Sequence, residues 1–224
     1  MRDARYDILF EPLAIGPVTA PNRFYQVPHC NGMGRKFPNA MIGMRETKAE
    51  GGWGIVATEQ CDFHITSDIE PYTESNMWDS GDELYLGRMV EVVHRHGSLA
   101  SIELAHSGQD AGNLYSREIP IGPAHRPVSA MHHPIQARAM DLSDIADYRR
   151  WHRRAALRAR DTGFDMVVVY AGHNNTVPGQ FFYKRHNDRS DAYGGVLENR
   201  LRLLRELIED TKEAVGDTMA VVVR

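Results

Sequence analysis

Short apolar runs alternate along the chain with longer segments in which apolar residues recur at helical spacing. The runs lie at residues 23–27, 54–58, 99–104, 164–170 and 219–223, and the helical segments at residues 41–50, 82–96, 141–162 and 197–215. Strands that alternate with helices form a parallel sheet with right-handed crossover connections. The pattern therefore predicts an α/β fold of about five strands and four helices.

This repeat favours a (β/α)8 TIM barrel over a doubly wound sheet. The units are similar in size, and no glycine-rich dinucleotide fingerprint follows the first apolar run. Eight such units typically take about 250 residues, so about five strands and four helices are roughly the first half of a barrel. We expect residues 1–224 to be the N-terminal part of a single barrel domain, because an open half barrel would expose unpaired strand edges.

Composition argues against several classes of protein. The chain has 26 Lys and Arg against 30 Asp and Glu, and its formal net charge of -4 gives no basic surface for a nucleic acid. Only two cysteines occur, and the first residues lack the apolar core of a signal peptide. No run approaches the roughly 18 apolar residues that a membrane helix needs. We therefore expect a cytoplasmic protein with no membrane or nucleic-acid partner.

Residues 105–140 are rich in Gly, Pro and His and show no periodicity. Loops of this length in compact domains are usually functional, so we expect a functional loop here. His132 and His133 lie within it, where a role in a lid and simple solvation are equally consistent with the sequence. Histidines on one helix bind a metal when they are three or four residues apart. His94 and His96 are not, and we expect no metal site in this chain.

The first apolar run is followed directly by Pro28, His29 and Cys30. In a parallel barrel the chemistry collects where strands end, which predicts that Cys30 lies in an active-site mouth. The alternative is a small packing residue, since free cysteine behaves as a small hydrophobe. A neighbouring imidazole can lower the pKa of a thiol, but adjacent residues on a strand point to opposite faces. The run alone leaves both readings open.

A specific motif lies at residues 188–200, with the sequence Asp-Arg-Ser-Asp-Ala-Tyr-Gly-Gly-Val-Leu-Glu-Asn-Arg. It resembles a stretch of the Old Yellow Enzyme class of flavin-dependent barrels. From the residues alone, Gly194 and Gly195 make the turn into the last helix, while Glu198 and Arg200 hold the preceding loop by ion pairs. Residues 25–30 and 48–53 narrow the resemblance to the branch of trimethylamine, dimethylamine and histamine dehydrogenases.

This resemblance implies that the barrel binds flavin mononucleotide (FMN) covalently through Cys30, with Val27, Pro28 and His29 around it. A flavin-bonding role is then the favoured interpretation of Cys30, ahead of a role as a small packing residue. Cys61 ends the neighbouring strand, so a disulfide between Cys30 and Cys61 is conceivable. A cytosolic compartment disfavours such a bond, and the default reading of Cys61 is a small packing residue.

The resemblance also assigns roles at the ends of later strands. Arg224 would stabilise the negative charge of the reduced flavin, and Glu103 would face its pyrimidine edge or pair with a barrel arginine. Tyr170 and His173 resemble the catalytic pair that deprotonates or orients the amine. Gln60 stands where trimethylamine dehydrogenases have a tyrosine of an aromatic bowl, which favours a substrate with N–H groups. The alternative is that Gln60 ties its loop to Asp62 or His64.

The resemblance implies a flavin-dependent amine dehydrogenase. It would oxidise a small secondary or primary amine, such as dimethylamine or histamine, to an imine that hydrolyses to an aldehyde. An electron acceptor such as an electron-transfer flavoprotein, a 4Fe-4S cluster beyond this chain and a homodimer would accompany it. The alternatives are an NAD(P)H-dependent ene-reductase with non-covalent FMN, and a half barrel that serves only in assembly.

Overall fold

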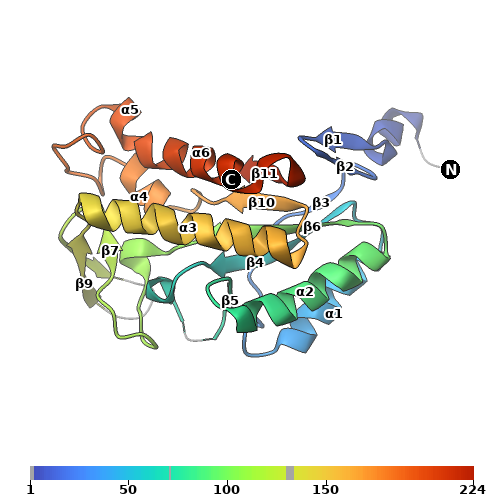
Figure 1. Ribbon diagram of the computed structural model, residues 1–224, viewed down its shortest axis with the longest axis horizontal. Helices are drawn as coiled ribbons and strands as arrows, with labels where there is room; N and C mark the ends of the chain where they lie inside the picture. The colour runs from blue at the N-terminus through green and yellow to red at the C-terminus, as the bar shows by residue number, and fades with distance from the viewer. Residues whose placement is uncertain (1–2, 71, 130–133) are drawn as a thin grey trace.

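The computed structural model describes residues 3–70, 72–129 and 134–224. A curled parallel sheet runs through its centre in the order β11-β10-β6-β4-β3 (Figure 1). Its strands are β3 (Tyr25–Gln26), β4 (Ile55–Asp62), β6 (Leu99–Ala105), β10 (Met166–Val169) and β11 (Ala220–Val223), and β5 (Ser75–Asn76) pairs with β4. Spatial order follows chain order, as in a barrel rather than a doubly wound sheet.

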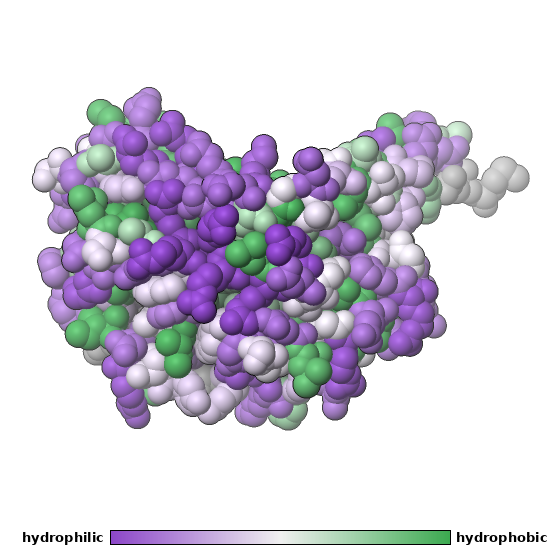
Figure 2. Space-filling view, viewed as in Figure 1, coloured by the Kyte–Doolittle hydropathy of each residue, from purple (hydrophilic) through white to green (hydrophobic). Residues whose placement is uncertain are grey.

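The long helices cover one face of this sheet. They are α1 (Pro38–Glu50), α2 (Ser80–Arg95), α3 (Leu142–Thr162) and α6 (Arg202–Val215), and each packs against the next along the chain. Figure 2 shows a largely hydrophilic surface over this helical layer. Ion pairs cross it, including Arg149 with Asp210 at 2.7 Å and Arg153 with Glu213 at 3.1 Å.

Alternating side chains of the strands enter two apolar clusters on opposite faces of the sheet. Val56, Ile102 and Val167 belong to the cluster that contains the helices. Ile55 and Met166 belong to a smaller cluster, which contains Ala20 of the antiparallel hairpin β1 (Leu13–Ile15) and β2 (Val18–Ala20). The hairpin therefore closes the fold at the amino ends of the strands, and the carboxyl ends remain for chemistry.

Helix ends follow the local sequence. Asp141 and Asp144 form a capping box at the start of α3, and Gly163 ends the helix with a φ of 97°. A left-handed φ favours glycine, so this position is a natural C-terminal stop. Asp79 and Asp82 form a second capping box at the start of α2. The helix predicted for residues 197–215 is instead divided at Leu201 into α5 (Leu197–Arg200) and α6.

The prediction of an irregular segment at residues 105–140 was wrong. This segment contains the 3-10 helix η3 (Gly108–Asp110) and a small sheet in the order β7-β9-β8. These strands are β7 (Ile121–Gly122), β8 (Arg126–Ser129) and β9 (Pro134–Ala139). They are short, and β8 and β9 each contain a proline, which hides strand periodicity. His132 and His133 lie outside the described residues. The helix α4 (Val177–Phe182) was also not predicted.

Candidate active site

Arg224, at the end of β11, connects three strand ends. Its Nη1 donates to the two carboxylate oxygens of Glu103 at 3.3 and 3.1 Å and to the carbonyl oxygen of Pro28 at 3.3 Å. The Glu103 side chain is 2% exposed. Burial raises the pKa of its carboxyl to about 7, although the Arg224 charge and hydrogen bond oppose this rise. The structure thus brings together Pro28, Glu103 and Arg224 as a polar group at the carboxyl end of the sheet.

Tyr170 and His173 lie beside this group. The Tyr170 hydroxyl is hydrogen bonded to Nδ1 of His173, which has a left-handed φ of 56°. The Arg224 guanidinium lies 5.3 Å from the centre of the Tyr170 ring. A Cβ atom at Gly172 would lie only 2.9 Å from this ring, so glycine lets the loop approach it closely. Burial, the first cause, and the Glu103 charge raise the pKa of the Tyr170 hydroxyl.

Cys30 is free and exposed, four positions beyond the end of β3 rather than directly after it. The surrounding protein displaces enough water to raise the pKa of the thiol to about 12, and nearby carboxylates, including those of Glu59 and Glu103, add to this rise. The backbone of Gln60 acts on this thiol and lowers the pKa of the group in part. Such a thiol is protonated at neutral pH unless a ligand or cation changes its surroundings.

The residues around Cys30 differ in exposure. Val27 is 51% exposed, His29 is exposed, and Pro28 is buried. The His29 amide donates to the carbonyl oxygen of Thr58 at 3.4 Å, which attaches the Cys30 segment to β4. Cys61 is buried and free, so it is the packing residue that we expected and forms no disulfide with Cys30.

Gln60 lies inside β4, opposite Glu103 of β6 in the strand register. Its side chain is buried, and its Nε2 has no hydrogen-bond partner among the described residues. It is not tied to Asp62, which accepts from Ser67, or to His64, which contacts Thr66. The Oε1 of Gln26 on β3 is also buried without a partner in the described chain, but Gln26 pairs with Val56, whose side chain lies in the cluster on the helical face of the sheet. A buried unpaired polar atom costs about 1–3 kcal/mol, so the Gln60 amide points to a missing ligand.

The donor set fits a planar polar heterocycle. Arg224 supplies a guanidinium, Glu103 a carboxyl, and Gln60 an amide group with an unpaired nitrogen. A flavin presents alternating donors and acceptors on one edge of its ring system, which groups of this kind can satisfy. No metal-binding cluster of His, Cys, Asp and Glu was found in the parts of the chain that the structure describes.

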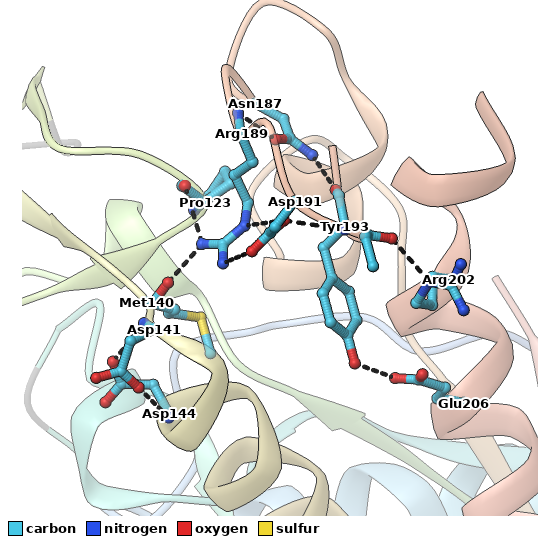
Figure 3. Close-up of polar contacts among 11 residues, drawn as sticks. Pro123, Met140, Asp141, Asp144, Asn187, Arg189, Asp191, Tyr193, Arg202 and Glu206 are labelled. Atoms are coloured by element: carbon cyan, nitrogen blue, oxygen red, sulfur yellow. Dashed lines mark hydrogen bonds and ion pairs between the residues drawn. The ribbon is translucent and has the colours of Figure 1, made fainter. Parts of the chain in front are cut away.

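The loop at residues 187–202 braces the barrel from outside this site (Figure 3). The Arg189 guanidinium pairs with Asp191 and donates to the carbonyl oxygens of Met140 and, at 3.4 Å, Pro123. The Tyr193 hydroxyl donates to Glu206 of α6 at 2.9 Å. The loop therefore ties the start of α3 to α6, which agrees with a structural role.

The prediction that Glu198 and Arg200 hold the preceding loop by ion pairs was wrong for the part of the chain that the structure describes. Arg200 donates instead to the carbonyl oxygens of Phe182, at 2.8 Å, and Gly195, while Glu198 is exposed. The guanidinium thus satisfies carbonyl groups left over at the end of α4 and in the turn before α5. Arg189 and Asp191 of the same motif form the ion pair that holds the loop.

The fold and the placement of its polar groups define the class. The curled sheet, its outer helices and a site at the carboxyl strand ends are those of a TIM-barrel protein of which this chain supplies part. Residues 8–224 match the model of the NADH:flavin oxidoreductase / NADH oxidase family, and the chain belongs to this family.

Amine-oxidising proteins are among its similar relatives. Dimethylamine dehydrogenase of Hyphomicrobium sp. (strain x) is 43% identical over 228 residues, covering 100% of this chain and 31% of that enzyme. The structure of 6-hydroxypseudooxynicotine amine oxidase from Pseudomonas geniculata N1 is 50% identical with a TM-score of 0.96, and histamine dehydrogenase from Rhizobium sp. 4-9 is 48% identical with a TM-score of 0.96. Both matches cover 100% of this chain and 34% of the other.

A relative of lower sequence identity is named for another activity. An NADPH dehydrogenase of Halalkalibacterium halodurans is 32% identical over 210 residues, which are 90% of this chain and 59% of that protein. The chain thus spans about one third of the length of each amine-oxidising relative and a larger share of the length of this NADPH dehydrogenase. None of the described helices is both long and apolar enough to cross a membrane.

Sequence reasoning missed some groups at this site. Arg45 was not singled out, a fully buried arginine that donates to the carbonyl oxygen of His29 at 2.9 Å. One signal was available for Glu59, which follows an apolar run directly and is itself fully buried. A charged residue in a buried strand is rare unless it is paired, so it marks a special site.

Proposed function

We propose that this chain supplies the flavin-binding part of an amine dehydrogenase that oxidises a small secondary or primary amine. The observation that carries the proposal is the assembly of Arg224, Glu103, Tyr170 and His173 at the carboxyl strand ends, beside an exposed Cys30. The similarity to dimethylamine dehydrogenase and histamine dehydrogenase supports the same reading. FMN, when bound, supplies the hydride acceptor.

Each residue then has a defined task. Cys30 bonds the FMN, and Val27, Pro28 and His29 lie along the same segment. Arg224 stabilises negative charge on the cofactor, because a guanidinium offers both charge and a planar set of donors. Glu103 meets the polar edge of the ring, and its pKa of about 7 lets it accept or donate a proton in a hydrogen bond.

Tyr170 and His173 act on the substrate. Their hydrogen bond joins a phenol to an imidazole, so a proton can pass between the substrate nitrogen and His173 through Tyr170. The raised pKa of Tyr170 keeps this phenol protonated in the free protein. Gln60 offers its amide oxygen to an amine N–H, which favours dimethylamine-like or histamine-like substrates over a fully substituted amine.

The remaining parts of the proposal concern the whole protein. We infer an electron acceptor protein, such as an electron-transfer flavoprotein, a 4Fe-4S cluster held outside residues 1–224, a homodimer and a cytoplasmic location. The second candidate is an NAD(P)H-dependent ene-reductase with non-covalent FMN, which the similarity to NADPH dehydrogenases favours.

Acid precipitation of the full-length protein separates these functions. We expect the flavin absorbance to stay in the protein pellet for the wild type and to move to the supernatant for Cys30→Ala, since this change removes only the bonding sulfur. The matched control is Cys61→Ala, which should keep flavin in the pellet. Flavin in the wild-type supernatant would favour the ene-reductase, no flavin at all would favour a non-catalytic module, and a flavin adduct that persists in Cys30→Ala would remove Cys30 from its role.

A further inference from the structure

Two buried side chains hold the backbone on either side of Cys30. Nη2 of Arg45, from α1, donates to the carbonyl oxygen of His29 at 2.9 Å. The carboxylate of Glu59, from β4, accepts from the amide of Asn31 at 3.4 Å. His29 and Asn31 are the chain neighbours of Cys30, so this residue stands between two anchors of opposite charge.

Neither anchor is a solvated surface group. Arg45 and Glu59 are both 0% exposed, and Nε of Arg45 has no hydrogen-bond partner in the described chain. Glu59 is held further by Ser75, whose hydroxyl donates to its Oε1 at 2.9 Å. Burying two charges costs several kcal/mol each, so a role beyond packing is expected of such a pair.

We propose that Arg45 and Glu59 are positioning residues that fix Cys30 and set the reactivity of its thiol in opposite directions. This rests on the proposed function only in that Cys30 is the flavin-bonding residue. The proposal concerns the free thiol before attachment. Arg45 favours the thiolate, whereas Glu59 opposes it and so limits side reactions of the exposed sulfur.

The charges around the thiol support these opposite effects of Arg45 and Glu59 on the thiolate. Burial lowers the pKa of the Arg45 guanidinium, and the charges of Glu59, Cys61 and the Cys30 thiolate raise it in part. Because such coupling is reciprocal, the guanidinium also favours the thiolate. The charged or titratable groups that act on Cys30 are Arg45 of α1, Glu59 of β4, Glu74 before β5, Glu103 of β6 and Tyr170 after β10. Arg45 is the cation among these groups, and α1 is the helix that provides it. Arg224 of β11 is a further cation near the Cys30 segment, since it donates to the carbonyl oxygen of Pro28.

The test is the rate at which iodoacetamide alkylates Cys30 between pH 7.5 and 10. It uses the full-length protein purified without flavin, and peptide mass spectrometry separates Cys30 from Cys61. A unit change in thiol pKa changes the rate by about threefold, since nucleophilicity falls as the pKa falls. We expect Arg45→Met to slow alkylation about threefold and Glu59→Gln to accelerate it about threefold. Arg45→Lys should remain near the wild type because it keeps the charge.

Opposite changes in the alkylation rate of the two variants distinguish this electrostatic role from a loosening of the fold. A purely structural pair would make Cys30 more accessible in both variants, and both would then react faster, which would overturn the proposal. Equal rates in Arg45→Met and the wild type would overturn it too. The matched control is Arg149→Met, which removes a partly buried arginine between α3 and α6 and should leave the rate unchanged. If Cys30→Ala still carried covalent flavin, the proposed function would fail while these rates still decided the roles of Arg45 and Glu59.

Discussion

Arg224 is the residue through which most of the candidate site is connected. It contacts Glu103, the Pro28 carbonyl and the face of Tyr170, and its side chain is 34% exposed. We expect Arg224→Lys to reduce covalent flavin content and turnover with little loss of folding, because lysine keeps the charge but loses the planar fork. Flavin absorbance per protein and Tm measure the two effects. Arg205→Lys, an exposed change on α6, is the control, and unchanged flavin content and turnover in Arg224→Lys would exclude the residue from the site.

Gln60 is the residue that should choose the substrate. Its unpaired buried Nε2 can donate a hydrogen bond to the lone pair of an amine, and its Oε1 can accept one from an amine N–H, while a tyrosine would offer a ring face to a fully substituted ammonium ion. We expect the wild-type protein to prefer dimethylamine or histamine over trimethylamine by roughly tenfold in kcat/KM, and Gln60→Tyr to shift this ratio toward trimethylamine. The measurement is the ratio of the two kcat/KM values. A wild-type ratio below one, or no change in the mutant, would mean that Gln60 does not select the amine.

Among the elements, α3 is the helix whose limits the sequence predicts most closely. Asp141 accepts the amide of Asp144 at 2.8 Å, and the Asp144 carboxylate returns a contact to the Asp141 amide at 2.8 Å. We expect Asp141→Ala to lower the free energy of unfolding by about 1 kcal/mol, the usual cost of losing an N-cap. Urea denaturation measures this value. Asp161→Ala, near the other end of α3, should change it much less, and equal losses would contradict the capping argument.

Apolar strands and capped helices could be predicted because their causes are local. The end of β4 could not, since Glu59, Gln60 and Asp62 are polar and yet buried, and the register of β4 against β6 shifts between Ala57 and Gln60. Tertiary contacts determine whether such a segment forms a strand, and the local sequence pattern does not indicate these contacts. For the same reason the anchoring of Cys30 by Arg45, from a helix outside the sheet, had no local signal.

Across the whole molecule, both outer strands of the sheet leave room for further strands. β11 pairs only with β10 and β3 only with β4 among the described residues. Val221 and Val222 are only partly buried, and Val223 is 47% exposed. The prediction that residues 1–224 form part of one barrel domain is consistent with these edges and stays a prediction.

The carboxyl end of the sheet also gathers acids whose pKa values are raised chiefly by burial. They are Glu59, Asp62, Asp68, Glu74 and Glu103, with Glu74 and Glu103 both at about 7. A folded state that holds protons more tightly than the unfolded chain is favoured at low pH. For Glu103, this stabilisation is complete below the ordinary value of 4.5 and is lost as the pH rises through about 7.

Glu103→Gln tests this dependence because glutamine stays neutral at every pH. We expect the stability of the flavin-free full-length protein, relative to that of the mutant, to fall between pH 5 and pH 8 by about 1–3 kcal/mol, since the wild type must bury a charge as the pH rises. Urea denaturation at the two pH values gives the difference. Glu118→Gln, at an exposed position, should show no such change relative to the wild type. If the stability difference between the wild type and Glu103→Gln were instead nearly the same at pH 5 and pH 8, the ion pair with Arg224 would outweigh the burial of the Glu103 charge, and the carboxyl would be ionised throughout this range.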